Sequence, residues 1–227
     1  MTLTQEELDA LEDYGVTDSS AFKRLDIEEP SFLMREPRYI SPSQILRKGK
    51  VGDVYDFNKR IALSKNPQSM AQVGDCIHQI FAGMEEKRPA YRVEMKEIIG
   101  SYHLSAVLTD EEAITDAWNN LYGRLEELHG KPLRTYHERP FRLEQDGQSI
   151  VGSIDLVWQT AEGNIVVDYK TNPMGPKAVL DPENEHFVGW YAGQLEAYQA
   201  ALEAAGEKVI KRYIYYPVNG LLVELAD

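Results

Sequence analysis

The segment Asn164-Ile-Val-Val-Asp-Tyr-Lys170 constrains the fold more than any other stretch of this 227-residue chain. Its apolar residues run on without polar alternation, which is typical of a strand buried on both faces. Such a strand belongs in the interior of a layered sheet. Because helical segments precede and follow it, we expect an α/β domain with a central mixed sheet flanked by helices, rather than a doubly wound one.

The other elements are read from their periodicity. An apolar stripe from Pro67 to Phe81 at three- and four-residue steps predicts one helix. The capping-box spacing of Thr109 and Glu112 opens another helix, which should end at Gly130. The remaining predictions are strands over 136–143, 150–158 and 164–170, a long and functional loop over 171–189, a helix over 191–205, and strands over 209–216 and 221–225.

The N-terminal segment looks peripheral. A capping box starting at Thr4 predicts a short helix that ends at Gly15, and residues 16–40 show no sustained period. We therefore divide the chain into an N-terminal helix and connector, residues 1–39, and a main domain, residues 40–227. That domain should begin with a helix capped by Ser41 or Ser43 and ended by the basic residues 47–50.

Charge and cysteine content exclude several classes of protein. The chain has 24 Lys and Arg against 37 Asp and Glu, a net charge of −13, which argues against a protein that coats nucleic acid through many phosphate contacts. A nuclease with a locally basic groove is still compatible with it. The single cysteine, Cys76, excludes an internal disulfide and an iron–sulfur cluster held by four cysteines. With no apolar run of membrane-spanning length and an acidic start, we expect a cytoplasmic protein without a membrane partner.

Two carboxylates and one lysine should converge. Asp168 and Lys170 are two residues apart in a strand, so both side chains leave the same face. For a tight hairpin centred on Ala161 and Glu162, Asp155 falls opposite Asp168. Paired buried carboxylates need a neutralising partner, and a divalent cation such as Mg²⁺ provides one. The alternative is that these are surface acids near a turn and a lysine at a sheet edge.

Five segments, in order, resemble the RecB-family nuclease domain of the PD-(D/E)XK superfamily, most closely the C-terminal nuclease domain of AddA-type helicase–nucleases. The resemblance covers about residues 40–220. Its most specific parts are Asp-Tyr-Lys-Thr and Gln-x-x-x-Tyr. The segments are Gly74-Asp-Cys-Ile-His78, Glu138-Arg-Pro-Phe141, Gly152-Ser-Ile-Asp155-Leu-Val157, Ile165-Val-Val-Asp168-Tyr-Lys170-Thr171 and Gln194-Leu-Glu-Ala-Tyr198.

The resemblance implies an Mg²⁺-dependent DNA nuclease, with Mn²⁺ able to substitute. The implied catalytic residues are Asp155, Asp168, Lys170 and Glu138; the implied metal ligands are His78, Asp155, Asp168 and the Tyr169 carbonyl; and Gln194 and Tyr198 would bind substrate or brace the lysine strand. Core packing is the alternative for Tyr198, and a satisfied core histidine is the alternative for His78. Phe187, Trp190 and Tyr191 could stack on unpaired bases, with packing again the alternative.

No phosphate-binding G-x-x-x-x-G-K-[ST] occurs in the sequence, so we expect no ATP site in this chain. We interpret it as the exonuclease part of a longer helicase–nuclease for double-strand-break repair and recombination, acting on DNA with single-stranded ends beside a helicase domain or subunit. The alternatives are a stand-alone RecB-like nuclease, a catalytically silent nuclease-fold module that binds DNA ends or protein partners, and a two-carboxylate hydrolase of the glycosidase type, which needs no lysine.

Overall fold

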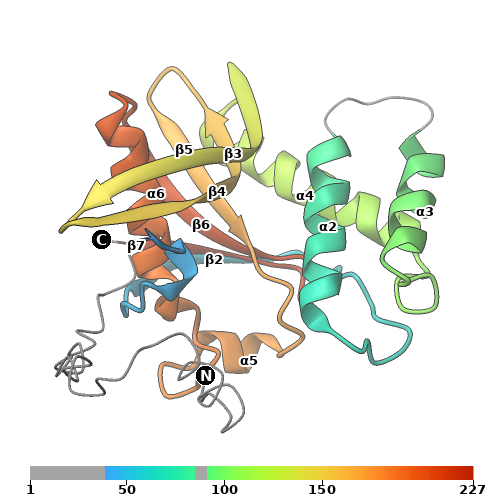
Figure 1. The fold of residues 1–227 in the computed structure, drawn as a ribbon. Helices are drawn as coiled ribbons and strands as arrows, with labels where there is room; N and C mark the ends of the chain where they lie inside the picture. The colour runs from blue at the N-terminus through green and yellow to red at the C-terminus, as the bar shows by residue number, and fades with distance from the viewer. Residues whose placement is uncertain (1–38, 85–90, 227) are drawn as a thin grey trace, which may run out of the picture. The chain divides into compact units, whose positions relative to one another are not determined.

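The computed structural model describes residues 39–84 and 91–226, and its core is a seven-stranded mixed sheet (Figure 1). The strands run in the order β1-β4-β5-β6-β7-β2, with β3 paired to β4 outside this path. The β1–β4 and β5–β6 pairs are parallel and the others antiparallel. The strands are β1 Tyr39–Ile40, β2 Lys50–Asp56, β3 Arg134–Gln145, β4 Gln148–Gln159, β5 Asn164–Tyr169, β6 Val209–Tyr216 and β7 Leu221–Ala226.

Helices cover both faces of this sheet, as Figure 1 shows for α2 and α4 on one side and α6 on the other. The helices are α2 Met70–Met84, α3 Tyr91–Ser101, α4 Glu111–His129, α5 Pro176–Leu180 and α6 Ala192–Ala204, with 3₁₀ turns η2 Pro42–Gln44 and η3 Val188–Trp190. Every residue of β5 is buried. Ile165 and Val167 pack with α2 and α4, whereas Val166 packs with α6. The predicted α/β architecture is therefore confirmed.

The register of the central hairpin is the predicted one. Leu156 pairs with Val167 and Gln159 with Asn164, so the hairpin is centred between Ala161 and Glu162. Continuing this register by one step places Asp155 opposite Asp168. The hairpin therefore fixes how the two carboxylates approach each other.

Some local predictions are wrong. The helix expected over 40–50 is a 3₁₀ turn in which the Gln44 side chain accepts from the Ser41 amide at 2.9 Å, and residues 50–56 form β2 instead. β2 was missed because it pairs only with β7 among the described strands, and most of its residues are exposed. The helix at 111 is capped by Asp110, whose carboxylate accepts from the Ala113 amide, rather than by Thr109.

Helix α3 was missed as well, because its buried residues Met95 and Ile99 are four apart among charged neighbours. The predicted loop over 171–189 contains the short helix α5. The helix predicted at Thr4–Gly15 and the connector that follows lie outside the described residues, apart from Tyr39 and Ile40 in β1. The division at residue 40 therefore stays a prediction.

Candidate active site

The end of β5 delivers an ion pair to the face covered by α6. Asp168 follows Val166 on that face and is 1% exposed. The Lys170 Nζ lies 2.6 Å from Asp168 Oδ2, so the two side chains leave the same face, as their spacing predicts. Burial lowers the pKa of Lys170, but the Asp168 and Asp155 carboxylates outweigh burial and raise it, so the lysine carries its charge at neutral pH.

Helix α6 completes this pair with a hydrogen-bonded network. Gln194 and Tyr198 are one turn apart and both buried. The Gln194 amide donates to Asp168 Oδ1 at 2.8 Å and to the Tyr198 hydroxyl at 2.6 Å, while its oxygen accepts from Lys170 Nζ at 3.1 Å. The Tyr198 hydroxyl in turn donates to Asp168 Oδ1 at 3.1 Å. The helix therefore holds the carboxylate and the ammonium in fixed positions.

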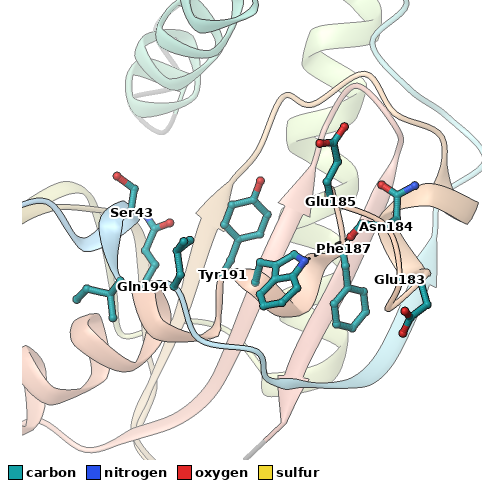
Figure 2. Close-up of a pocket in the computed structure, with 10 residues that line it drawn as sticks. Ser43, Glu183, Asn184, Glu185, Phe187, Tyr191 and Gln194 are labelled. Atoms are coloured by element: carbon teal, nitrogen blue, oxygen red, sulfur yellow. Dashed lines mark hydrogen bonds between the residues drawn. The ribbon is translucent and has the colours of Figure 1, made fainter.

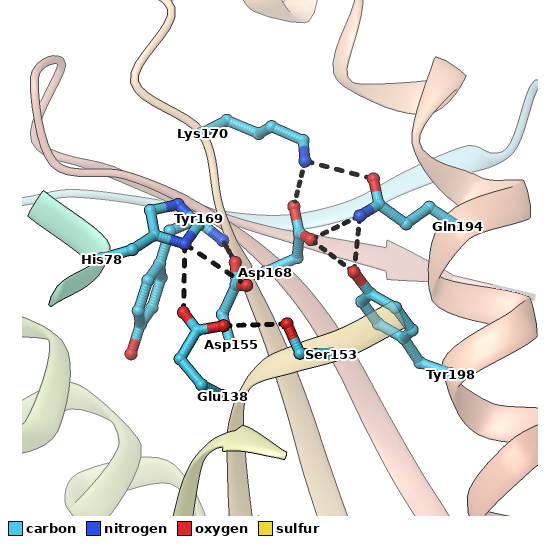
Figure 3. Close-up of polar contacts among 9 residues, drawn as sticks. All are labelled: His78, Glu138, Ser153, Asp155, Asp168, Tyr169, Lys170, Gln194 and Tyr198. Carbon is cyan, nitrogen blue, oxygen red and sulfur yellow. Dashed lines mark hydrogen bonds and ion pairs between the residues drawn. The ribbon is translucent and has the colours of Figure 1, made fainter. Parts of the chain in front are cut away.

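A second cluster lies on the other side of β5 and contains His78, Glu138 and Asp155 (Figure 3). The His78 Nδ1 lies 3.3 Å from Glu138 Oε1 and 3.4 Å from Asp155 Oδ1. Ser153 donates to the other Glu138 oxygen at 2.8 Å, and the Tyr169 amide donates to Asp155 Oδ2 at 2.6 Å. Each of the three residues in the cluster offers a ligand atom, and these atoms lie within 4.8 Å of one another.

The backbone is strained at Glu138. This residue has φ 44° in the middle of β3, where the left-handed conformation disfavours any residue except glycine. The pairs on either side, His137 with Leu156 and Arg139 with Ile154, keep a single register, and Glu138 itself makes no ladder pair. Strain of this kind persists where the surrounding structure imposes it and is common at functional sites. Here it accompanies a carboxylate that reaches His78.

The charges in this cluster are strongly perturbed. Burial lowers the pKa of His78, but hydrogen bonds to Asp155 and Glu138 outweigh burial and raise it to about 10. Burial, together with the nearby Asp168 charge, raises the pKa of Asp155 to about 6. The hydrogen bond with His78 lowers the pKa of Glu138. The cluster is thus two carboxylates held together by a positive charge.

The donor set fits a divalent cation. Adjacent ligands of an octahedral metal with bonds of about 2.1 Å lie about 3 Å apart. The separations of 3.3 and 3.4 Å from His78 to the two carboxylates are close to that value. A cation among them would take over the neutralising role that the His78 imidazolium has here. Carboxylate oxygens suit Mg²⁺, and an added imidazole suits Mn²⁺ better.

The predicted site residues are therefore divided between two groups. Figure 3 shows Asp155 with His78 and Glu138, and Asp168 on the side of Lys170 and Gln194. Asp168 does not belong to the group of three whose ligand atoms converge in the described part of the chain. Tyr169 meets the cluster through its amide, and a ligand role for its carbonyl stays a prediction.

Two residues near the site were not singled out from the sequence as part of it. Ser153 fixes the Glu138 carboxylate, and its position two residues before Asp155 on the same strand was a usable signal. The ring of Tyr191, at the start of α6, lies 4.8 Å from Lys170 Nζ. It is thus an aromatic neighbour of the lysine, where the sequence suggested only stacking or packing.

Comparison with known proteins agrees with this geometry. A family model described as the PD-(D/E)XK nuclease superfamily matches residues 54–225. Curated relatives carry names that make them subunits of an ATP-dependent helicase/nuclease: that of Alkaliphilus oremlandii is 25% identical over 207 residues, covering 79% of this chain and 17% of the relative. That of Anoxybacillus flavithermus is 28% identical over 122 residues, covering 52% and 10%. That of Thermoanaerobacter sp. is 32% identical over 90 residues, covering 39% and 7%.

The chain thus spans between 7% and 17% of the length of these relatives. Within the described residues, no helix has the length and apolar character needed to cross a membrane.

Proposed function

The chain belongs to the PD-(D/E)XK nuclease superfamily, and on that premise we propose that it is a divalent-metal-dependent deoxyribonuclease. The proposal rests above all on one juxtaposition. A His78–Glu138–Asp155 group able to hold a cation lies beside a charged lysine that is locked onto a buried carboxylate. This combination suits hydrolysis of a phosphodiester.

In the proposed mechanism, His78, Glu138 and Asp155 hold the cation. Bound there, the cation lowers the pKa of the attacking water and neutralises charge on the phosphate. Lys170 keeps its proton and so acts through its positive charge, positioning the phosphate and stabilising the charge that develops on its oxygens. Asp168, Gln194 and Tyr198 keep the lysine in place, since each is part of the network that reaches its Nζ.

Asp168 is also proposed as a ligand of the cation, together with the Tyr169 carbonyl. Asp168 already raises the pKa of Asp155, so the two carboxylates lie close enough to interact. The cation is proposed to be Mg²⁺, with Mn²⁺ able to substitute.

A wider role is proposed from the relatives. Because they are named as parts of a helicase/nuclease and the chain matches a small part of each, we assign it the exonuclease function of such an enzyme in double-strand-break repair. Its substrate would then be DNA with single-stranded ends, delivered by a helicase domain or subunit in the cytoplasm. A stand-alone nuclease is the alternative.

The test is digestion of end-labelled single-stranded and duplex DNA with Mg²⁺, with Mn²⁺ and with EDTA. We compare the wild type with Lys170→Met, and use Lys177→Met, a lysine of α5 outside the network, as the matched control. We expect metal-dependent cleavage that Lys170→Met abolishes and Lys177→Met retains. Cleavage in EDTA, or full activity of Lys170→Met, would overturn the proposal. Binding of DNA without cleavage would favour the silent module.

A further inference from the structure

A pocket of about 520 Å³ adjoins the lysine (Figure 2). It is mainly apolar, and its size is that of a site for a small planar molecule. Figure 2 shows Gln194 and Tyr191 toward one end of this pocket and Phe187 with Asn184 toward the other. Phe187 is buried, whereas Trp190 and Tyr191 are half-buried and keep part of their surface open to a ligand.

The pocket is continuous with the candidate active site. Gln194 lines it and also accepts a hydrogen bond from Lys170 Nζ. Tyr191 lines it as well, with its ring 4.8 Å from the same Nζ. A molecule held against these two residues is therefore next to whatever the lysine binds.

The charges around the pocket indicate which part of a nucleotide it can take. Glu183 and Glu185 are exposed on its rim and would repel a phosphate. Lys48 contributes one cation, 5.3 Å from the Trp190 ring and 5.6 Å from the Phe187 ring, and donates to the Pro182 carbonyl. An uncharged aromatic group fits this lining better than an anion does.

We propose that the pocket receives the unpaired base of the nucleotide next to the phosphate under attack, an inference that rests on the proposed nuclease function. Trp190 and Tyr191 would supply the stacking surface. A base within a duplex is stacked and paired with its neighbours, so it cannot enter without being freed. The pocket would therefore make the enzyme select single-stranded DNA at one specific nucleotide.

The test is an abasic scan. Non-cleavable phosphorothioate oligonucleotides, each lacking one base at a successive position from the end, are titrated against the wild-type protein by fluorescence anisotropy. Stacking on an aromatic side chain contributes about 1–3 kcal/mol per base, so loss of the base at the responsible position should weaken binding about fivefold or more. The effect should disappear in Trp190→Leu and persist in Tyr136→Leu, which removes a half-buried aromatic of β3 outside the pocket.

A second measurement needs no variant. An oligonucleotide with 5-iodouracil at the sensitive position is irradiated with the wild-type protein, and the cross-linked peptide should contain residues 190 and 191. Cross-linking elsewhere, or equal binding of all abasic oligonucleotides, would overturn the proposal. Cleavage of an ordinary oligonucleotide with Mg²⁺ is measured in parallel. Cleavage without an abasic effect refutes the base pocket alone, and an abasic effect without cleavage refutes the nuclease function alone.

Discussion

Replacing Tyr198 with phenylalanine removes one oxygen atom from the most connected part of the site. Tyr198 is 2% exposed, and its ring packs edge-on against Phe141 with centroids 5.4 Å apart, a contact that phenylalanine retains. The lost hydroxyl donates to Asp168 and accepts from Gln194. A hydrogen bond to a charged group contributes about 1.5–3 kcal/mol, and a buried donor left unpaired adds to the loss. We expect Tyr198→Phe to lower the free energy of unfolding by about 2 kcal/mol.

The assay is urea denaturation followed by tryptophan fluorescence at constant slope, with Tyr216→Phe as the control. Tyr216 is also fully buried, but its hydroxyl has no hydrogen-bond partner among the described residues. The same substitution there should leave stability unchanged or raise it. Cleavage by Tyr198→Phe should also slow, because Asp168 loses one of the bonds that orient it. If Tyr198→Phe is as stable and as active as the wild type, Tyr198 is a packing residue and its hydroxyl has no part in orienting Asp168.

Three further predictions concern the cluster and its surroundings. Glu138→Gly should be about 1 kcal/mol more stable than Glu138→Ala by urea denaturation, the reverse of the usual order, since glycine accepts φ 44° without strain. The wild type should reach half-maximal cleavage at lower Mn²⁺ than Mg²⁺, and titration of His78→Ala should show this preference reduced if the imidazole is a ligand. Burial lowers the pKa of His137 from 6.5 to about 4, so the unfolded chain binds more protons between these values. The wild type should therefore lose up to about 3 kcal/mol relative to His137→Gln as the pH falls from 6.5 to 4, and parallel stability curves would contradict this.

The parts of the site that follow from short-range rules could be predicted from the sequence. The facing of Asp155 and Asp168 follows from a tight hairpin between two apolar strands, and the shared face of Gln194 and Tyr198 follows from helical spacing. These positions depend on one element or on two neighbouring ones. The sheet and its helical layers followed in the same way from the unbroken apolar run of β5.

The partition of the site could not be predicted, since it depends on which layer covers each face. Asp168 faces α6 and is taken up by Gln194, while His78 on α2 collects Glu138 and Asp155 from the other side. The left-handed backbone of Glu138 has no sequence signal, because glutamate in a strand is otherwise extended. β2 was missed because few of its residues are buried and its pairing with β7 is remote in sequence.

The amide of Tyr169 hydrogen-bonds to a side chain that can titrate and bind metal, where a strand residue would ordinarily donate to a backbone carbonyl. The strength of that bond depends on the charge that Asp155 carries and on whatever else draws on its oxygens. The proton chemical shift of this single amide, and the rate at which it exchanges with deuterium, are thus an internal spectroscopic reporter of the cluster. An NMR titration of the Tyr169 resonance would follow cation occupancy in the absence of any DNA, and would separate a variant that has lost its metal from one that has lost only its chemistry.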